Sequence, residues 1–447
     1  MEPIILRRSG RAIFRYLVAS ALTLAAWSVE PALLHGQELR ALEDQFYLGV
    51  GTHQGIGGAV SKRGYLPSTS VEQIKQLGLT SFRDDFPWSE FEIANRRWGF
   101  SSSLTRLKAQ LETDVARPML ILGSGNPIVP QSDPPTTDEA RRRFVEYSIA
   151  AAQSVATRKP IFELWNEWNI STRHNPQFDA ATYFLLAQTT YPAFKQAFPD
   201  TPFVVGAIGD DPYWQWTQSL LQAGILKFAD GISIHLYNHC ARVSNRTAAE
   251  VIDRLRTFHQ MIDRASGRAD FPVYLTETGW PTAIGKCGVS EQTQADNMAQ
   301  LILWASTSCP WLKGIWLYEL KDSGTDTTDL EHNFGIYHFD NSPKPAACAV
   351  RDSWSFTRSS LQAEQTSPAS KVTMIKINSG SEQKIAVWSD DPSRVQEIHV
   401  QNGESGTFKY VCGEAKPMGS QWIRVSSTPL LMTFSSITPV LEIRRAQ

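Results

Sequence analysis

The segment PIFELWNE, residues 160–167, contains the pattern that decides the fold. Its apolar and aromatic residues form a run of the length of one buried strand, and Pro160 bounds the run at its start. The run ends in Asn166 and Glu167, with Trp165 and Trp168 on either side of this polar pair. Similar runs occur along much of the chain, so the segment belongs to a repeated arrangement.

Short runs rich in β-branched and aromatic residues alternate with longer stretches of helical periodicity. The predicted helices include residues 68–78, 138–157, 180–198 and 250–265. This alternation predicts an α/β protein with a parallel sheet, and eight strands are the number that closes a (β/α)₈ TIM barrel. The predicted strands are residues 46–53, 79–85, 117–124, 160–167, 202–208, 230–237, 271–277 and 313–320.

An open, doubly wound sheet is the competing architecture. Such a fold usually places a Gly-x-Gly-x-x-Gly loop between its first strand and the following helix. The stretch GVGTHQGIGG, residues 49–58, has the glycines but neither that spacing nor a following helix. The barrel is therefore the favoured architecture.

The pattern changes near residue 357. Residues 357–371 are polar and predict a linker, and residues 372–447 consist of short alternating strands without a long helix. We expect a barrel over residues 37–356 and a small antiparallel β-sandwich over residues 372–447. This module either binds glycan or supports the barrel.

The N-terminal residues 1–36 resemble an export signal or an uncleaved membrane anchor, because four arginines precede a short apolar run at residues 16–27. We therefore expect an exported protein, periplasmic or secreted, that meets a membrane only through this segment. Export permits disulfides. The five cysteines match no zinc pattern. We expect a bridge between Cys240 and Cys287, which follow neighbouring strands, and Cys309–Cys348 is the weaker second pair.

The composition excludes a strongly charged partner. The net charge is −2, so no strong field favours nucleic acid or an anionic membrane surface. The 14 tryptophans are the unusual feature, because flat aromatic faces are common in carbohydrate sites, although an aromatic-rich core would also account for them. We expect a monomer without metal or organic cofactor.

In a (β/α)₈ enzyme the catalytic residues lie at the carboxyl ends of the strands. The fourth predicted strand ends at Glu167 and the seventh at Glu277, and glycosidic cleavage requires two such carboxylates. One is protonated to assist the leaving oxygen, and the other is ionised to attack the anomeric carbon. Further polar side chains occur at the other strand ends, namely Arg83, His235, Tyr237, His53 and Tyr318.

Several of these residues also have structural interpretations. Arg83 could pair with Asp84 or Asp85, and His235 could be an inner-barrel histidine with its hydrogen bonds satisfied. Trp165 and Trp316 lie inside predicted strands and are expected in the core.

The segments WNE (165–167) and TETGWP (276–281) resemble the retaining glycoside hydrolases of clan A. Within that clan the plan is similar to family 39, and in particular to bacterial exopolysaccharide endoglycosidases of the PslG type. The resemblance covers about residues 46–350. It implies that Glu167 is the acid/base and Glu277 the nucleophile. Trp168 departs from the pattern, because the clan commonly has Pro at that position.

The resemblance also implies roles for the neighbours of the two carboxylates. Asn166 would bind the sugar 2-hydroxyl, Tyr237 would contact the nucleophile, and His235 and Arg83 would support that network. Tyr318 is a further candidate for substrate binding. The candidates for stacking on sugar rings are Trp88, Trp168, Trp214 and Trp280.

These observations predict a retaining endo-glycosidase that hydrolyses a polysaccharide, such as a bacterial exopolysaccharide. Two alternatives stay open. A non-catalytic polysaccharide-binding or assembly protein could use the same barrel, and a transglycosylase would share every residue of the hydrolase.

Overall fold

The computed structural model describes residues 46–56, 63–171, 175–358, 362–379, 382–391, 393–401, 406–435 and 440–445. The expected export signal or N-terminal anchor, residues 1–36, lies outside the described residues. Among the described helices, none is both long enough and apolar enough to cross a membrane.

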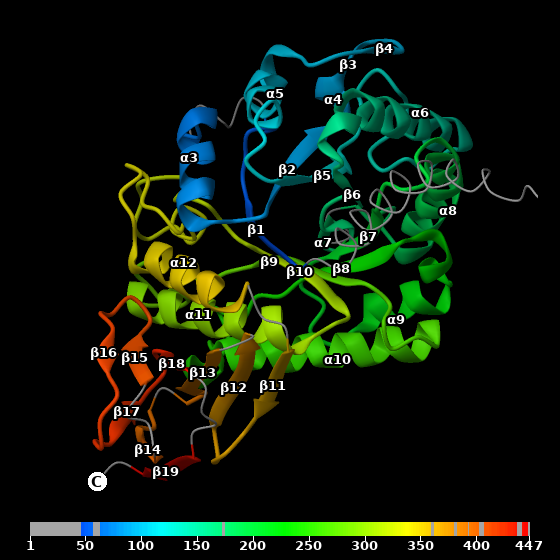
Figure 1. Cartoon of the computed structure of the whole chain (residues 1–447). Helices are drawn as coiled ribbons and strands as arrows, with labels where there is room; N and C mark the ends of the chain where they lie inside the picture. The colour runs from blue at the N-terminus through cyan, green and yellow to red at the C-terminus, as the bar shows by residue number, and fades with distance from the viewer. Residues whose placement is uncertain are drawn as a thin grey trace, which may run out of the picture. The chain divides into compact units, whose positions relative to one another are not determined.

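Eight parallel strands of the described chain form a closed barrel in the order β1-β10-β9-β8-β7-β6-β5-β2 (Figure 1). Each of the eight predicted runs overlaps one of these strands, so the predicted TIM barrel is confirmed. The barrel strands are β1 (Tyr47–Gly51), β2 (Ser81–Pro87), β5 (Arg117–Gly123), β6 (Ile161–Leu164), β7 (Phe203–Ile208), β8 (Gly231–His235), β9 (Val273–Thr278) and β10 (Leu312–Leu317).

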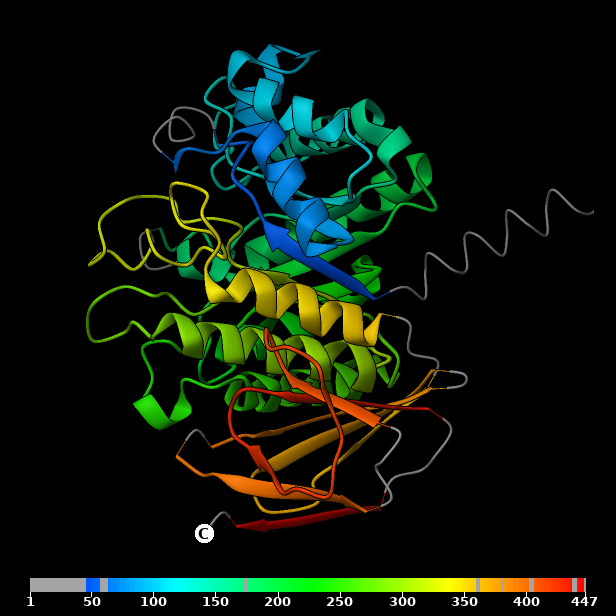
Figure 2. The same cartoon turned by 60° about the vertical axis from the view of Figure 1, so that its left-hand side comes forward.

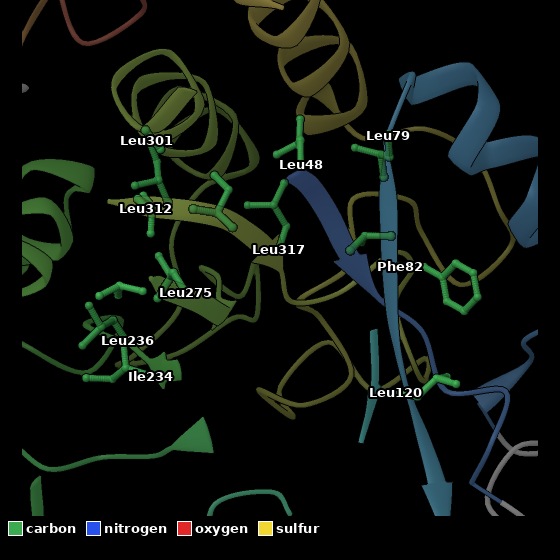
Figure 3. Packing of buried hydrophobic residues seen from close by; sticks show 14 of the residues in the cluster. Leu48, Leu79, Phe82, Leu120, Ile234, Leu236, Leu275, Leu301, Leu312 and Leu317 are labelled. Carbon is green, nitrogen blue, oxygen red and sulfur yellow. The ribbon is translucent and has the colours of Figure 1, made fainter. Parts of the chain in front are cut away.

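Most residues of the barrel strands are apolar, because helices cover the outside of the barrel and side chains fill the inside. Figure 3 shows Leu48, Phe82, Leu275 and Leu317 packed among the strands and the surrounding helices. A separate buried cluster, which includes Trp316, fills the amino-terminal end of the barrel. A Cβ atom on Gly49 would lie 2.3 Å from the Trp316 indole, so this packing requires glycine.

The helices form the outer layer, and the four longest begin at a side-chain cap. Thr137, Asp179, Thr247 and Ser290 each accept a hydrogen bond from a backbone N–H of the first turn. The helices are α3 (Pro67–Leu77), α4 (Trp88–Phe91), α5 (Thr105–Leu111), α6 (Asp138–Val155), α7 (Trp168–Ser171), α8 (Ala180–Ala197), α9 (Gln215–Gln222), α10 (Ala248–Ser266), α11 (Glu291–Ser308) and α12 (Pro345–Thr357).

The C-terminal strands form antiparallel sheets, orange to red in Figure 1. One sheet has the order β11-β12-β13-β18-β15-β16 and the other β17-β14-β19. A short hairpin of β3 (Glu92–Ala94) and β4 (Arg97–Trp98) lies in the barrel region. The C-terminal strands are β11 (Gln362–Thr366), β12 (Val372–Ser379), β13 (Glu382–Ser389), β14 (Gln396–Gln401), β15 (Gly406–Tyr410), β16 (Lys416–Pro417), β17 (Ile423–Val425), β18 (Leu430–Ser435) and β19 (Val440–Arg445).

The expected linker at residues 357–371 is corrected by the structure. Strand β11 lies within it and pairs antiparallel with β12. The sequence of β11, QAEQT, is polar. Because β11 is an edge strand, it lacks the run of apolar residues by which a buried strand is recognised in a sequence. The barrel region and the C-terminal sheets are therefore joined by a shorter connection than expected.

The larger C-terminal sheet is buried on both faces. Along β13, Ile385 and Val387 belong to the core between the two C-terminal sheets, whereas Ala386 and Trp388 belong to the core shared with the barrel. This is the period of two expected of a strand with two covered faces. Helices α11 and α12 lie side by side (Figure 2), and α11 contacts β11 and β12. The module therefore packs against the barrel helices.

The structure contains the predicted Cys240–Cys287 bridge, but the second predicted pair is wrong. Cys348 bonds to Cys412, and Cys309 is free. One turn further along α12, Asp352 accepts hydrogen bonds from the backbone of Cys412 and from Lys409 Nζ. This face of α12 therefore holds the end of β15, a contact between distant segments that sequence spacing does not reveal.

We predict that the double variant Cys348→Ser/Cys412→Ser is less stable than the wild type. The bridge closes a sequence separation of 64 residues, and loops of that size contribute roughly 2–4 kcal/mol by restricting the unfolded chain. Urea unfolding measures the difference. Cys309→Ser is the matched control, because its thiol is free, and equal midpoints for all three proteins would contradict the prediction.

Candidate active site

A cavity of about 690 Å³ opens at the carboxyl ends of the barrel strands. Its wall includes the ends of β1, β2, β6, β8, β9 and β10 and the loops that follow them. A volume of this size lies within the usual range of small-molecule sites. The predicted site residues that line it are Arg83, Asn166, Glu167, His235, Tyr237, Glu277 and Tyr318, together with His53.

Arg83 lines this cavity and is 4% exposed. Its Nε atom donates to Glu163 Oε2 at 2.7 Å, and Nη1 donates to Glu277 Oε1 at 2.6 Å. Its Nη2 atom donates to Asn166 Oδ1 at 2.7 Å and lies 3.4 Å from His235 Nε2. One guanidinium therefore joins β2 to β6, β8 and β9. The carboxylates of Glu163 and Glu277 hold the pKa of Arg83 above its ordinary value despite burial.

The alternative pairing of Arg83 with Asp84 or Asp85 is wrong. Side chains alternate along β2, so Arg83 and Asp85 face the cavity and Asp84 lies on the other face. Asp84 instead accepts hydrogen bonds from the backbone N–H groups of Gln54 and Gly55 at 2.9 and 2.8 Å. Burial, and then the nearby Asp85, raises the pKa of Asp84 to about 6. Asp84 therefore fixes the loop after β1 against β2.

Glu277 is held as a carboxylate by its neighbours. Besides Arg83, the Tyr237 hydroxyl donates to its Oε2 atom at 2.9 Å, and His235 Nδ1 lies 3.4 Å from the same oxygen. Burial alone would raise the pKa of Glu277, but His235, Arg83 and the hydrogen bond from Tyr237 together hold it below the ordinary value. The Glu277 side chain is therefore ionised near neutral pH.

Glu167 faces Glu277 across His235. His235 Nδ1 lies 2.9 Å from Glu167 Oε1, and an oxygen of Glu167 lies within 4.8 Å of one of Glu277. Trp165 and Glu167 have positive φ values of 63° and 46°, a conformation that costs free energy in residues other than glycine. This turn directs Glu167 across the end of the barrel.

His235 bridges the two carboxylates. Its side chain is fully buried, and its two ring nitrogens contact Glu167 and Arg83, so both are engaged within the site. The donor atoms of Glu167, His235 and Glu277 also lie close enough together to hold a metal ion. The Arg83 guanidinium already occupies Glu277 Oε1, however, and its positive charge opposes a cation at this position.

Three of the four predicted stacking tryptophans are in the core instead. Trp88, Trp168 and Trp280 are 0% exposed. Trp88 donates to Glu92 at 2.7 Å, Trp168 to the Asp179 carbonyl at 3.0 Å, and Trp280 to Asn238 at 2.8 Å. Each indole N–H thus has a buried partner, which is the usual condition for burying tryptophan. These residues position loops and do not stack on a ligand from these positions.

The remaining aromatic predictions have mixed outcomes. Trp214 packs against Phe258, and the Arg254 guanidinium lies over its ring. Among these described residues it is Arg254, and not Trp214, that lines the cavity. Tyr318 does line the cavity and donates to Glu331 at 3.2 Å. Trp165 and Trp316 are buried, as predicted.

The sequence analysis missed Asp85, Arg63 and Glu331, which also line the cavity. Asp85 could have been found from the strand period, because it lies two residues beyond Arg83. Arg63 and Glu331 come from loops after β1 and β10, where no periodic signal exists.

No family model and no curated protein matches the chain. Solved structures do match it. A family 39 glycoside hydrolase from the gut symbiont Bacteroides cellulosilyticus WH2 superposes with a TM-score of 0.71 at 21% identity, over 88% of this chain and 82% of that one. A GH39 β-xylosidase from Caulobacter crescentus gives a TM-score of 0.60 at 14% identity, over 87% and 96%. The GH39 enzyme from Xanthomonas axonopodis pv. citri gives 0.59 at 14% identity, over 88% and 94%.

These matches cover 87–88% of this chain. They show that the chain shares the fold of solved family 39 glycoside hydrolases. The fold agrees with the resemblance found in the sequence.

We predict that Glu163→Ala lowers the stability of the folded protein. Glu163 is 0% exposed, and its removal leaves the buried Arg83 Nε atom without its carboxylate, which typically costs about 3–5 kcal/mol. Thermal unfolding measures the effect. Glu167→Ala is the matched control, because its side chain is 29% exposed and has no contact with Arg83 in the described network. A similar unfolding midpoint for both variants would contradict this account of Arg83.

Proposed function

We propose that this protein is a retaining glycoside hydrolase in which Glu277 is the nucleophile and Glu167 the acid/base. The observation that carries the proposal is the approach of the two carboxylates to within 4.8 Å inside one cavity. Retaining enzymes place their carboxyl groups about 5–5.5 Å apart, whereas inverting enzymes need about 6.5–9.5 Å to admit a water molecule. The depressed pKa of Glu277 fits a nucleophile that must be ionised.

The geometry supports a double displacement. Glu277 attacks the anomeric carbon while Glu167 gives its proton to the glycosidic oxygen, so that the C–O bond breaks and the leaving sugar departs as an alcohol. Glu167, now ionised, removes a proton from water. The water oxygen attacks the anomeric carbon of the glycosyl ester and releases Glu277 as a carboxylate.

Asn166 supports the proposed role on the sugar 2-hydroxyl. Arg83 donates to Asn166 Oδ1, which fixes the amide and leaves its NH₂ group as the donor for a ligand in the cavity. His235, between the two carboxylates, positions Glu167 relative to Glu277. These residues orient the reacting groups before the substrate arrives.

The proposed substrate is a polysaccharide, cleaved internally, and a bacterial exopolysaccharide is the substrate class that the sequence resemblance suggests. We also propose that the protein is exported and acts as a monomer in the periplasm or outside the cell. The Cys240–Cys287 and Cys348–Cys412 bridges support export, because disulfides persist mainly in oxidising compartments.

The proposal is tested by trapping the glycosyl-enzyme. We expect 2,4-dinitrophenyl 2-deoxy-2-fluoro-glycosides to label Glu277 covalently. Fluorine slows both the formation and the hydrolysis of the intermediate, but the good leaving group speeds its formation, so the intermediate accumulates. Peptide mass spectrometry locates the label. Glu277→Gln should lose roughly 10⁴-fold in kcat and take up no label. Undiminished hydrolysis by Glu277→Gln would overturn the assignment of Glu277 as the nucleophile. Binding of polysaccharide with neither hydrolysis nor labelling would favour the binding-protein alternative. Product analysis with acceptor sugars separates a hydrolase from a transglycosylase.

We predict that Tyr237→Phe moves the acidic limb of the kcat/KM profile to higher pH. Glu277 must be ionised to react, and its pKa is held low in part by the Tyr237 hydroxyl. Loss of this donor raises the pKa of Glu277, so activity is lost earlier as the pH falls. Tyr213→Phe is the control, because Tyr213 is 78% exposed. An unchanged acidic limb in Tyr237→Phe would contradict the prediction, because it would mean that the Tyr237 hydroxyl does not lower the pKa of Glu277.

A further inference from the structure

A buried hydrogen bond joins the two segments that carry Tyr237 and Glu277. The pairing of β8 with β9 ends at His235 and Glu277, and the Tyr237 hydroxyl meets Glu277 just beyond this point. Side chains must therefore hold Tyr237 in place. One residue after Tyr237, Asn238 Oδ1 accepts a hydrogen bond at 2.8 Å from Nε1 of Trp280, which follows Glu277 by three residues.

Asn238 is a fixed acceptor for this bond and is 5% exposed. Its Nδ2 atom donates to the carbonyls of Asn245 and Thr247, each at 2.8 Å, and to Glu250 Oε2 at 2.9 Å. Thr247 caps α10 and Glu250 lies in its first turn, so the amide is attached to the start of that helix. The amide satisfies all these partners in one orientation, with Nδ2 toward the three oxygens and Oδ1 toward Trp280.

Trp280 is held from the other side. Its side chain is 0% exposed, and its carbonyl accepts a hydrogen bond from Gln294 Nε2 of α11 at 2.9 Å. A Cβ atom on Gly279 would clash with the Tyr318 carbonyl oxygen, so the chain between Glu277 and Trp280 packs closely against the segment after β10. Both ends of the bond from Trp280 to Asn238 are thus anchored on the barrel.

Other contacts flank this bond. Thr278 Oγ1 donates to the Leu236 carbonyl at 2.9 Å on the strand side of Tyr237, and the disulfide between the two loops follows on the rim side. Arg254 Nη1 of α10 donates to the Tyr237 carbonyl at 3.0 Å. The backbone of Tyr237 is therefore attached to α10, and the indole bond connects this segment to the residues that follow Glu277.

We propose that Asn238 and Trp280 are positioning residues whose hydrogen bond keeps the Tyr237 hydroxyl on Oε2 of Glu277. This inference rests on the proposed glycosidase function and adds two residues that act through Tyr237, without contact with the reacting atoms. A hydrogen bond weakens steeply when its donor is displaced or tilted. Loss of the link between the two segments therefore weakens the contact between Tyr237 and Glu277.

The electrostatic surroundings of Glu277 make this contact important. Burial raises the pKa of Glu277, and His235, Arg83 and the hydrogen bond from Tyr237 together hold it below the ordinary value. The other titratable groups around it are the carboxyl groups of Asp85, Glu167 and Glu331 and the hydroxyl of Tyr318. Negative charge on these groups adds to the effect of burial, so a weaker contact with Tyr237 raises the pKa of Glu277.

The test is Trp280→Phe, which removes the indole N–H and keeps a buried aromatic ring. We expect kcat/KM for an aryl glycoside to fall by roughly tenfold and its acidic limb to move to higher pH, because the nucleophile is less well held and less readily ionised. An acidic limb identical to that of the wild type would overturn the inference.

Trp88→Phe is the matched control. Trp88 is also 0% exposed and donates a buried hydrogen bond, to Glu92 at 2.7 Å, but it lies outside the two segments. This variant should unfold at a lower temperature than the wild type and keep the wild-type acidic limb. An equal shift of the limb in Trp88→Phe and Trp280→Phe would show a general loosening of the protein and would also overturn the inference.

A double variant tests whether Trp280 acts through Tyr237. The acidic limb of Tyr237→Phe/Trp280→Phe should coincide with that of Tyr237→Phe alone, because the contact that Trp280 supports is already lost. Additive shifts of the two substitutions would contradict the proposal. Asn238→Leu, which keeps the approximate shape of the side chain without its hydrogen bonds, should move the limb in the same direction. It replaces Trp280→Phe in these comparisons if that variant does not fold.

The ionisation of Glu277 can also be followed without a substrate. Carbon-13 NMR of protein labelled at the glutamate side-chain carboxyls records each group against pH, and the signal of Glu277 is the one missing from Glu277→Gln. We expect Glu277 to titrate at higher pH in Trp280→Phe than in the wild type.

The two proposals fail in different ways. If the fluoro-glycosides label Glu277 and hydrolysis proceeds, but Trp280→Phe changes neither the acidic limb nor the titration, only the positioning role is wrong. If no glycoside is hydrolysed and none labels Glu277, the proposed function is wrong. The titration then still shows whether the bond from Trp280 to Asn238 acts on Glu277.

Discussion

The Arg83 guanidinium is the interaction on which the site depends. A buried charge of this kind is tolerated only when partners replace the water it has lost, and here Glu163, Glu277 and Asn166 do so. The same contacts hold Glu277 ionised and fix the Asn166 amide. Glu163, which cannot reach the substrate because it is fully buried, contributes by holding Arg83 in place.

The fold brings these groups together because parallel strands all end at the same side of a barrel. Residues from β2, β6, β8 and β9 are far apart in the sequence, yet one arginine contacts three of the other strands or the turns that follow them. Asp84 fixes the loop after β1, and the Cys240–Cys287 bridge joins the loops after β8 and β9. The C-terminal sheets pack against the barrel helices, away from the cavity residues.

Much of this arrangement could be predicted from sequence, for identifiable reasons. The barrel strands carry short apolar runs, and the polar residues that close them, such as Glu167 and Glu277, mark the strand ends. The tryptophans could not be placed in this way, because an indole just beyond a strand end can turn toward solvent or core. Trp168, the first residue of α7, turns inward to Trp165 and Phe178. The Cys348–Cys412 bridge joins the barrel region to the C-terminal module, a contact that depends on how the two pack.

The central claim is that the two carboxylates act by double displacement. Proton NMR of the hydrolysis of an aryl glycoside, followed from the first turnovers, measures it most directly by recording the anomer that appears before mutarotation. The first product should have the same anomeric configuration as the substrate, since two inversions at one carbon restore it. A first product of the opposite configuration would contradict the account, because it requires direct attack by water and a wider separation of Glu167 from Glu277 than the structure has.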